Sequence, residues 1–162
     1  LMYRMLMTLL LVVSAWSLSA QNAPVPEKFT LETPEDCARY DGDVLRCAEW
    51  MLSTPYAELS RIDRLQVAGF LIKWAGLTPD VTSDMDARME PAMKESLELS
   101  TLFLAVYLSG GAKYALQCDE KPEVKAVSEA GIDAVIAYYE VNRSAIGKVK
   151  PIERMIRSER KP

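Results

Sequence analysis

The 162-residue sequence contains no histidine. Histidine is the commonest general base near neutral pH and the commonest metal ligand in proteins. Its absence excludes serine–histidine and cysteine–histidine catalysis and removes most zinc sites. Carboxylates alone can still catalyse reactions, but a pair such as Glu95 and Glu98 is typical of a solvated helix face. We therefore expect no enzymatic activity, no cofactor and no metal site.

Signals for β-strands are nearly absent too. The sequence has no Asn-Gly hairpin turn and no sustained alternation of polar and apolar residues. Helix starts are plentiful instead, each with proline near the first helical position and an acidic residue in the first turn. Five segments have this pattern: Thr33-Pro34-Glu35-Asp36, Thr54-Pro55 with Glu58, Thr78-Pro79-Asp80, Lys121-Pro122-Glu123 and Lys150-Pro151 with Glu153. The sequence predicts an all-α fold, a compact helical bundle or an irregular helical array of about five to six helices.

Apolar spacing indicates which helix faces are buried. Residues 102–108 are apolar on every side, which is typical of a central helix, and Gly110-Gly111 is expected to end or bend it. In residues 56–76 the expected core face is Leu59, Ile62, Leu65, Ala68 and Ile72, with Arg61, Arg64 and Lys73 largely elsewhere. A helix over 122–146, stopped by Gly147, has small residues that permit a close neighbour: Ala130, Gly131, Ala134 and Ala137.

The first 20 residues resemble a secretory signal peptide. Arg4 precedes an apolar run over residues 5–13, and small residues ending in Ser19-Ala20 follow. The export machinery and signal peptidase recognise this order, so we expect cleavage near Ala20 and an exported protein, periplasmic or secreted. The alternative is an uncleaved anchor, but a spanning helix needs about 20 consecutive apolar residues. We expect no later stretch to reach that length, and hence no transmembrane span in the mature chain.

The rest of the chain is expected to form one domain. Residues 21–32 contain two prolines and are predicted to be a flexible lead-in. Residues 33–162 are predicted to be a single helical domain, because a chain of this length can bury one hydrophobic core of its own.

Three cysteines, Cys37, Cys47 and Cys118, leave the disulfide pattern open. Disulfides are permitted in an exported protein, but an odd count leaves at least one thiol. An unbroken helix over residues 37–47 would hold the first two sulfurs about 15 Å apart, too far for a bond. A break at Asp41-Gly42-Asp43 would allow that bond. A bridge from Cys118 to either one, or buried thiols packed as small apolar residues, are the remaining readings.

Charge is unevenly distributed along the chain. The leader carries one of the 19 basic residues and no acidic one, which leaves residues 21–162 with 18 basic and 23 acidic side chains. Residues 143–162 hold seven basic residues against two acidic ones. The candidates for contact with a partner are Arg143, Lys148, Lys150, Arg154, Arg157 and Arg160. A basic tail on an acidic body favours anionic lipid, envelope polysaccharide or an acidic protein. Export disfavours nucleic acid, and the alternative is a merely solvated outer face of a terminal helix.

Three segments are similar to segments of small secreted helical proteins of Bacteroidota. They are Leu52-Ser53-Thr54-Pro55-Tyr56, Lys73-Trp74 with Thr78-Pro79-Asp80, and Gly147-Lys148-Val149-Lys150-Pro151-Ile152. The resemblance extends over most of the mature chain. It implies a location in the cell envelope, and it carries over no catalytic residue.

These observations predict a non-catalytic interaction or binding module of the cell envelope. Its partner would be another envelope protein or an anionic envelope surface. The alternative is a periplasmic carrier that holds a small apolar ligand beneath residues 102–108. The aromatic residues that could line such a pocket are Trp50, Trp74, Tyr107, Tyr138 and Tyr139, although aromatics at helical spacing more often form plain core.

Overall fold

The computed structural model describes residues 22–79, 81 and 85–160, and within them the chain is all-helical, as predicted. The predicted signal peptide and its cleavage site lie outside these residues. The six α-helices are α1 (Pro34–Ser53), α2 (Arg61–Leu77), α3 (Glu90–Met93), α4 (Leu97–Gln117), α5 (Val124–Ile146) and α6 (Lys150–Glu159). Two short 3-10 helices, η1 (Tyr56–Glu58) and η2 (Ala87–Met89), precede α2 and α3.

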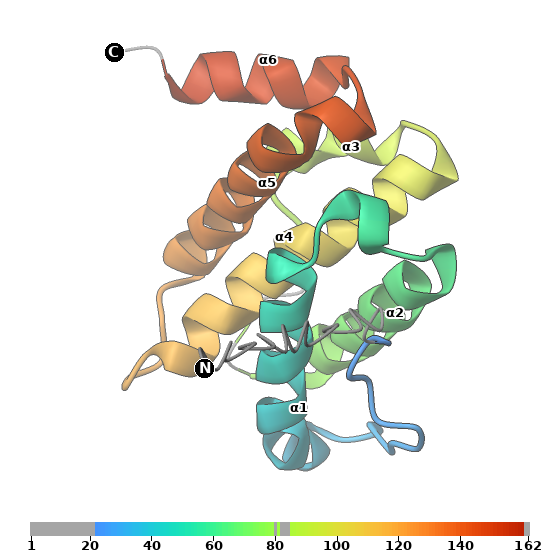
Figure 1. The fold of residues 1–162 in the computed structure, drawn as a ribbon. Coiled ribbons are helices and arrows are strands. Elements are labelled where there is room, and N and C mark those ends of the chain that lie inside the picture. The colour runs from blue at the N-terminus through green and yellow to red at the C-terminus, as the bar shows by residue number, and fades with distance from the viewer. Residues whose placement is uncertain (1–21, 80, 82–84, 161–162) are drawn as a thin grey trace, which may run out of the picture.

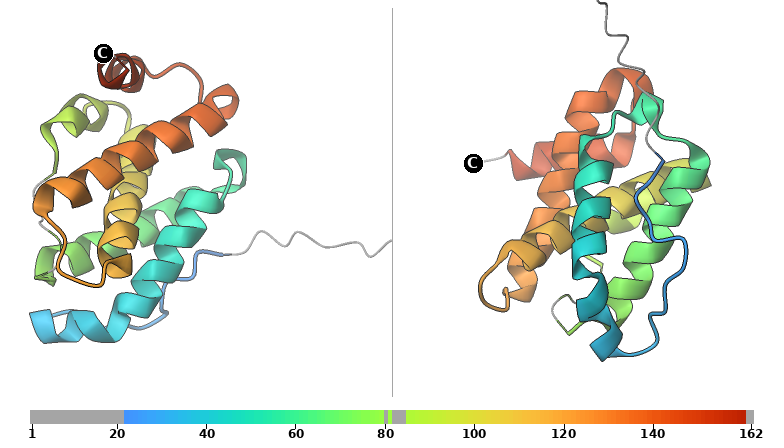
Figure 2. Two further views of the ribbon diagram at one scale, coloured as in Figure 1. Left: turned by 90° about the vertical axis from the view of Figure 1, so that its left-hand side faces the viewer. Right: turned by 60° about the horizontal axis from the view of Figure 1, so that its bottom comes forward.

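Helix α4 is the centre of the bundle. It contacts α1, α2, α3 and α5, whereas α6 contacts α5 and α3. Figure 1 shows α5 on one side of α4 and α1 and α2 on the other, with α6 lying across one end of the molecule. The left-hand view of Figure 2 shows α6 at the edge of the bundle. The prediction that residues 102–108 form the central helix is confirmed, because Leu102, Phe103 and Val106 are fully buried.

The predicted helix starts are only partly right. Pro34 and Pro151 lie in the first turn of α1 and α6, as expected. Thr54-Pro55, however, leads only into η1, and α2 begins later, where the Ser60 hydroxyl accepts a hydrogen bond from the Asp63 amide. Thr78 ends α2 rather than starting a helix. A threonine–proline pair breaks a preceding helix as readily as it begins the next one, so this local signal does not distinguish a start from an end.

The expectation that Gly110-Gly111 ends the central helix is wrong, because α4 continues to Gln117. The glycines instead allow α5 to lie very close. A Cβ atom on Gly110 would stand 2.4 Å from the Ala134 Cβ and 2.6 Å from the Ala130 carbonyl oxygen. A Cβ on Gly131 would stand 2.7 Å from the Tyr107 ring. The small face predicted for α5 is therefore confirmed as a close contact at Ala130, Gly131 and Ala134, whereas Ala137 is exposed. We call this contact the α4–α5 seam.

A polar network closes one end of the seam. Arg88 forms a two-point ion pair with Asp86, through Nε at 2.9 Å and Nη2 at 2.8 Å, and it also contacts Glu129 of α5 and Glu159 of α6. Asp86 accepts a hydrogen bond from the Ser128 hydroxyl at 2.7 Å. Hydrogen bonds from Arg88 hold the pKa of Asp86 well below its usual value, despite the opposing effect of burial. The network joins η2, α5 and α6.

The face predicted to be buried in α2 is only partly right: Ala68 is buried, and so is Leu59 just before the helix. Ile62, Leu65 and Ile72 are 66%, 45% and 48% exposed. The buried residues of this helix are Arg64, Val67, Ala68, Phe70, Leu71, Trp74 and Ala75. Both faces of α2 carry apolar residues, so spacing alone does not select one, and the larger aromatic side chains occupy the core. Ile62, Leu65, Gly69 and Ile72 lie exposed on the opposite side and are called the outer face of α2.

Residues 22–32, predicted to be a flexible lead-in, have no helix but pack against α1 and α2. The Phe29 ring lies edge-on to Phe70, with centroids 4.9 Å apart. The Ala23 amide donates to Asp63 Oδ1 at 3.1 Å, and the Cys47 thiol donates to the Pro24 carbonyl at 3.4 Å. The lead-in therefore covers part of the bundle.

Helix α4 also bears on the expected absence of a membrane span. It has 21 residues and an 18-residue window with a mean hydropathy of 1.2, so by length and composition it is a candidate span, contrary to expectation. Of that window, 56% is buried inside the protein. The core helix of a helical bundle has the same properties.

Candidate functional site

Helix α6 carries most of the predicted basic site on an amphipathic frame. Val149, Ile152 and Met155 are buried against the bundle. Lys150, Arg154 and Arg157 are exposed, and their spacing of four and three residues places them on one side of the helix. The apolar side is thus occupied by the protein's own core, and the basic side faces solvent.

The structure separates the six predicted basic residues into two groups. Arg143 Nη2 lies 2.6 Å from Glu153 Oε1, and Arg160 forms an ion pair with Glu140. The hydrogen bonds that Arg143 donates to Glu153 raise the pKa of Arg143. These two cations are matched by acids of the neighbouring helix. Because both are paired, the structure does not support Arg143 and Arg160 as part of a basic binding site.

The other four residues form no ion pair within the described part of the chain. These are Lys148, in the loop after α5, and Lys150, Arg154 and Arg157 of α6, all of them exposed. We call the three residues of the helix the cationic face of α6. The two acidic residues of α6 do not neutralise this face, because Glu153 pairs with Arg143 and Glu159 pairs with Arg88.

The turn before α6 fixes how this face is oriented. Gly147 has φ = 85°, a conformation that side chains rarely adopt, and it ends α5 as predicted. The Tyr139 hydroxyl accepts a hydrogen bond from the Val149 amide at 3.0 Å. It lies 3.1 Å from both the Gly147 carbonyl oxygen and Glu153 Oε1, either of which can accept its proton. One buried tyrosine thus joins α5, the turn and the first turn of α6.

All three cysteines are thiols in this structure. Cys37 and Cys47 are buried in α1, which runs unbroken through Gly42 and so keeps their sulfurs apart, as the helical reading requires. Burial raises the pKa of Cys47 to about 12, so its thiol stays protonated and unreactive near neutral pH. Cys118 is half-buried at the end of α4. The reading that holds for Cys37 and Cys47 is therefore that of buried thiols packed in the core.

The pocket expected beneath the central helix is almost filled. Trp74, Tyr107 and Leu108 border a cavity of about 20 Å³, together with residues of α5. That volume suits about one water molecule and is far below the roughly 300–1,000 Å³ of ordinary ligand sites. Trp74 and Tyr139 are fully buried core residues. The space beneath the central helix is therefore too small to support a function as a carrier of an apolar ligand.

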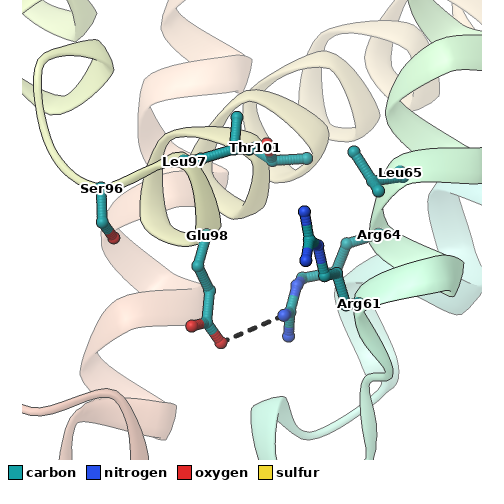
Figure 3. A pocket seen from close by; sticks show the side chains of 7 residues that line it. All are labelled: Arg61, Arg64, Leu65, Ser96, Leu97, Glu98 and Thr101. Atoms are coloured by element: carbon teal, nitrogen blue, oxygen red, sulfur yellow. Dashed lines mark hydrogen bonds and ion pairs between the residues drawn. The ribbon is translucent and has the colours of Figure 1, made fainter.

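A larger cleft of about 310 Å³ lies between the starts of α2 and α4. It is lined by Arg61, Arg64, Leu65, Ser96, Leu97, Glu98 and Thr101 (Figure 3). Arg64 is only 5% exposed, contrary to the expected solvent position. Its Nη1 donates to the Leu59 carbonyl and its Nη2 to Glu98 Oε1, each at 3.1 Å.

The Glu98 carboxylate is held from a second side. The Tyr56 hydroxyl donates to Glu98 Oε1 at 2.8 Å, and the Tyr56 ring lies under the Arg64 guanidinium, 5.6 Å from ring centroid to Cζ. Burial and the bond to Glu98 raise the pKa of Tyr56. Residues from η1 and α2 thus hold the Glu98 carboxylate of α4 in place at the cleft.

Sequence reasoning missed this cleft. Arg64 and Glu98 are 34 residues apart, and neither stands out from other charged helix residues. One signal could have been used. In a helical projection Arg64 falls between Val67 and Ala68, and the structure shows that this face of α2 is buried. No group of three or more acidic or cysteine residues in the described ranges is placed to hold a metal ion.

Comparison with models of known protein families, with curated proteins and with solved structures finds no match. The function of the chain is therefore argued from its own residues.

Proposed function

We propose that the protein is an exported, non-catalytic interaction module of the cell envelope, and that the cationic face of α6 binds an anionic envelope surface. The observation that carries the proposal is the exposure of Lys150, Arg154 and Arg157 on one side of α6 without ion pairs in the described residues. Cations left without acids in an otherwise acidic protein provide a local site for negative charge.

The burial of the apolar side of α6 supports contact by charge rather than by insertion. Ile152 and Met155 are 0% and 5% exposed, so they are committed to the bundle. A surface helix that enters a lipid layer needs its apolar side free. Binding is therefore expected to be electrostatic, and salt should weaken it because the Debye length falls from about 10 Å at 0.1 M salt to about 3 Å at 1 M.

The test is sedimentation of the purified protein with vesicles of phosphatidylglycerol and phosphatidylcholine, compared with phosphatidylcholine alone. The variant Lys150→Gln/Arg154→Gln/Arg157→Gln should lose at least about tenfold in binding, since each basic residue near an anionic surface contributes about 1 kcal/mol. A matched control, Lys94→Gln/Lys121→Gln/Lys125→Gln, removes the same charge from exposed positions elsewhere.

The control variant should bind as well as the unchanged protein. An equal loss in both variants would show that overall charge, not the cationic face, governs binding. Binding that persists undiminished at high salt would contradict an electrostatic contact. If the unchanged protein does not bind anionic vesicles, an anionic lipid surface is excluded as the partner.

A further inference from the structure

The cleft between α2 and α4 has more positive than negative charge. Arg61 and Arg64 both line it, together with a single carboxylate, that of Glu98, which Arg64 contacts (Figure 3). Arg61 forms no ion pair with any described residue. The one acid in α2, Asp63, does not line the cleft and accepts hydrogen bonds from the Ala23 amide and the Ser60 hydroxyl. One positive charge in the cleft is therefore left without a partner carboxylate.

Donors remain in place for a ligand. The two hydrogen bonds of Arg64 use two of the five N–H groups that a guanidinium offers. The cleft also includes the first turn of α4, where Ser96 caps the helix and the Thr101 hydroxyl lies nearby. The first N–H groups of a 21-residue helix lack acceptors within the helix, and the helix dipole adds positive potential there.

The rim of the cleft is apolar on both sides. Leu65 of α2 is 45% exposed and Leu97 of α4 is 65% exposed. Figure 3 shows Leu97 on the α4 side of the cleft and Leu65 on the α2 side. A ligand with a charged end and a short apolar part would cover both leucines while its charge meets the arginines.

We propose that this cleft binds a small monocarboxylate with an apolar tail. The carboxylate lies against Arg61 and the free donors of Arg64, and the tail lies on Leu65 and Leu97. A planar carboxylate matches the paired donors of a guanidinium. A single negative charge balances the one unmatched cation, whereas a doubly charged phosphate would leave excess negative charge beside Glu98. This inference is independent of the cationic face of α6, and it places ligand binding away from the filled core beneath α4.

The test uses octanoate as the probe, with octanamide as an uncharged analogue of the same length and octyl phosphate as a more highly charged one. Affinities are measured by titration calorimetry on the whole protein, and the location by amide shifts in nuclear magnetic resonance spectra. Octanoate should bind about tenfold more tightly than octanamide, because charge-assisted hydrogen bonds are lost in the amide. The amide shifts should centre on Leu97 and Thr101.

Variants separate the charge from the apolar contact. Arg61→Gln should weaken octanoate by about tenfold and leave octanamide unchanged. Leu97→Ser should weaken both compounds. Both positions are exposed, so folding is preserved even if Arg64→Gln proves unstable. Arg157→Gln, which removes an equally exposed guanidinium from α6, should change neither affinity.

Four results would overturn the proposal. They are equal affinities for octanoate and octanamide, tighter binding of octyl phosphate than of octanoate, undiminished octanoate binding by Arg61→Gln, and shifts centred on α6 instead of on the cleft. Absence of octanoate binding at millimolar concentration, where even weak ligands bind, would also exclude it.

Discussion

The α4–α5 seam and the outer face of α2 are built from similar residues, but the seam is buried and the outer face is exposed to solvent. Each has glycine among apolar side chains at helical spacing. At the seam, a Cβ on Gly110 would overlap with Ala134 and with the Ala130 carbonyl. On the outer face of α2, a Cβ on Gly69 would meet nothing within 4 Å.

The difference shows what periodicity can and cannot decide. In α5 the side opposite the seam is mostly polar, with Asp133 and Glu140 exposed on it, although Val141 elsewhere on the helix is also 83% exposed. In α2, Phe70, Leu71 and Trp74 compete with Ile62 and Ile72 for the core, and the larger, aromatic set is the one that is buried. A glycine therefore reports close packing only where another helix covers its side, as at Gly110 of α4 and Gly131 of α5.

The largest expected effect is at the seam. Gly110→Ala should lower the free energy of unfolding by roughly 3 kcal/mol, because the new methyl group overlaps with backbone that cannot move aside without shifting α5. Urea denaturation followed by circular dichroism measures the change. A loss below about 1 kcal/mol would show that α5 moves away easily and that the seam is less close than described.

A smaller loss is expected from the polar network at the end of the seam. Asp86→Asn should destabilise the protein by about 2 kcal/mol near neutral pH, since hydrogen bonds to charged groups contribute about 1.5–3 kcal/mol. Because the folded pKa of Asp86 is lowered, its contribution is present above the ordinary aspartate pKa of about 3.9 and is lost as the pH falls below it.

The difference in stability between the unchanged protein and Asp86→Asn should therefore be constant at higher pH and narrow below about pH 4. Denaturation curves over a pH series provide this comparison. Asp133→Asn, an exposed acid on α5, is the control and should change stability little. A difference that grows toward acid pH would contradict the assigned direction of the pKa.

The smallest effect is expected on the outer face of α2, with the opposite sign. Gly69→Ala should raise stability by about 1 kcal/mol, because alanine favours the helix and no atom lies in its way. The same denaturation experiment measures it. Destabilisation by this variant would show that another part of the protein, or a second molecule, contacts the face.

Much of the architecture could be predicted from local signals. The helical class, the buried central helix, the small face of α5 and the stop at Gly147 each depend on a few adjacent residues with one physical outcome. The errors arise where one local signal competes with another signal or with tertiary packing. Thr78-Pro79 ends a helix because the preceding apolar segment had already formed one, and Gly110-Gly111 stays helical because packing against α5 outweighs the lower helix propensity of glycine.

The candidate sites were less accessible to prediction. The basic character of α6 is visible in the sequence, but Arg160 is matched by Glu140 only because α5 and α6 meet in space. The cleft depends on Tyr56, Arg64 and Glu98, which lie on η1, α2 and α4. Contacts between distant residues follow from tertiary packing, and a single sequence contains no periodic signal for them.

The hydroxyl group of Tyr139 affects how the cationic face of α6 is presented to a partner. It joins α5 to the turn and to the start of α6, and so it determines the angle at which α6 leaves the body. The direction of these three positive charges thus depends on one buried, uncharged group. An approaching anionic surface would encounter charge with a defined heading, so the protein should bind in a single pose, with its acidic body turned away.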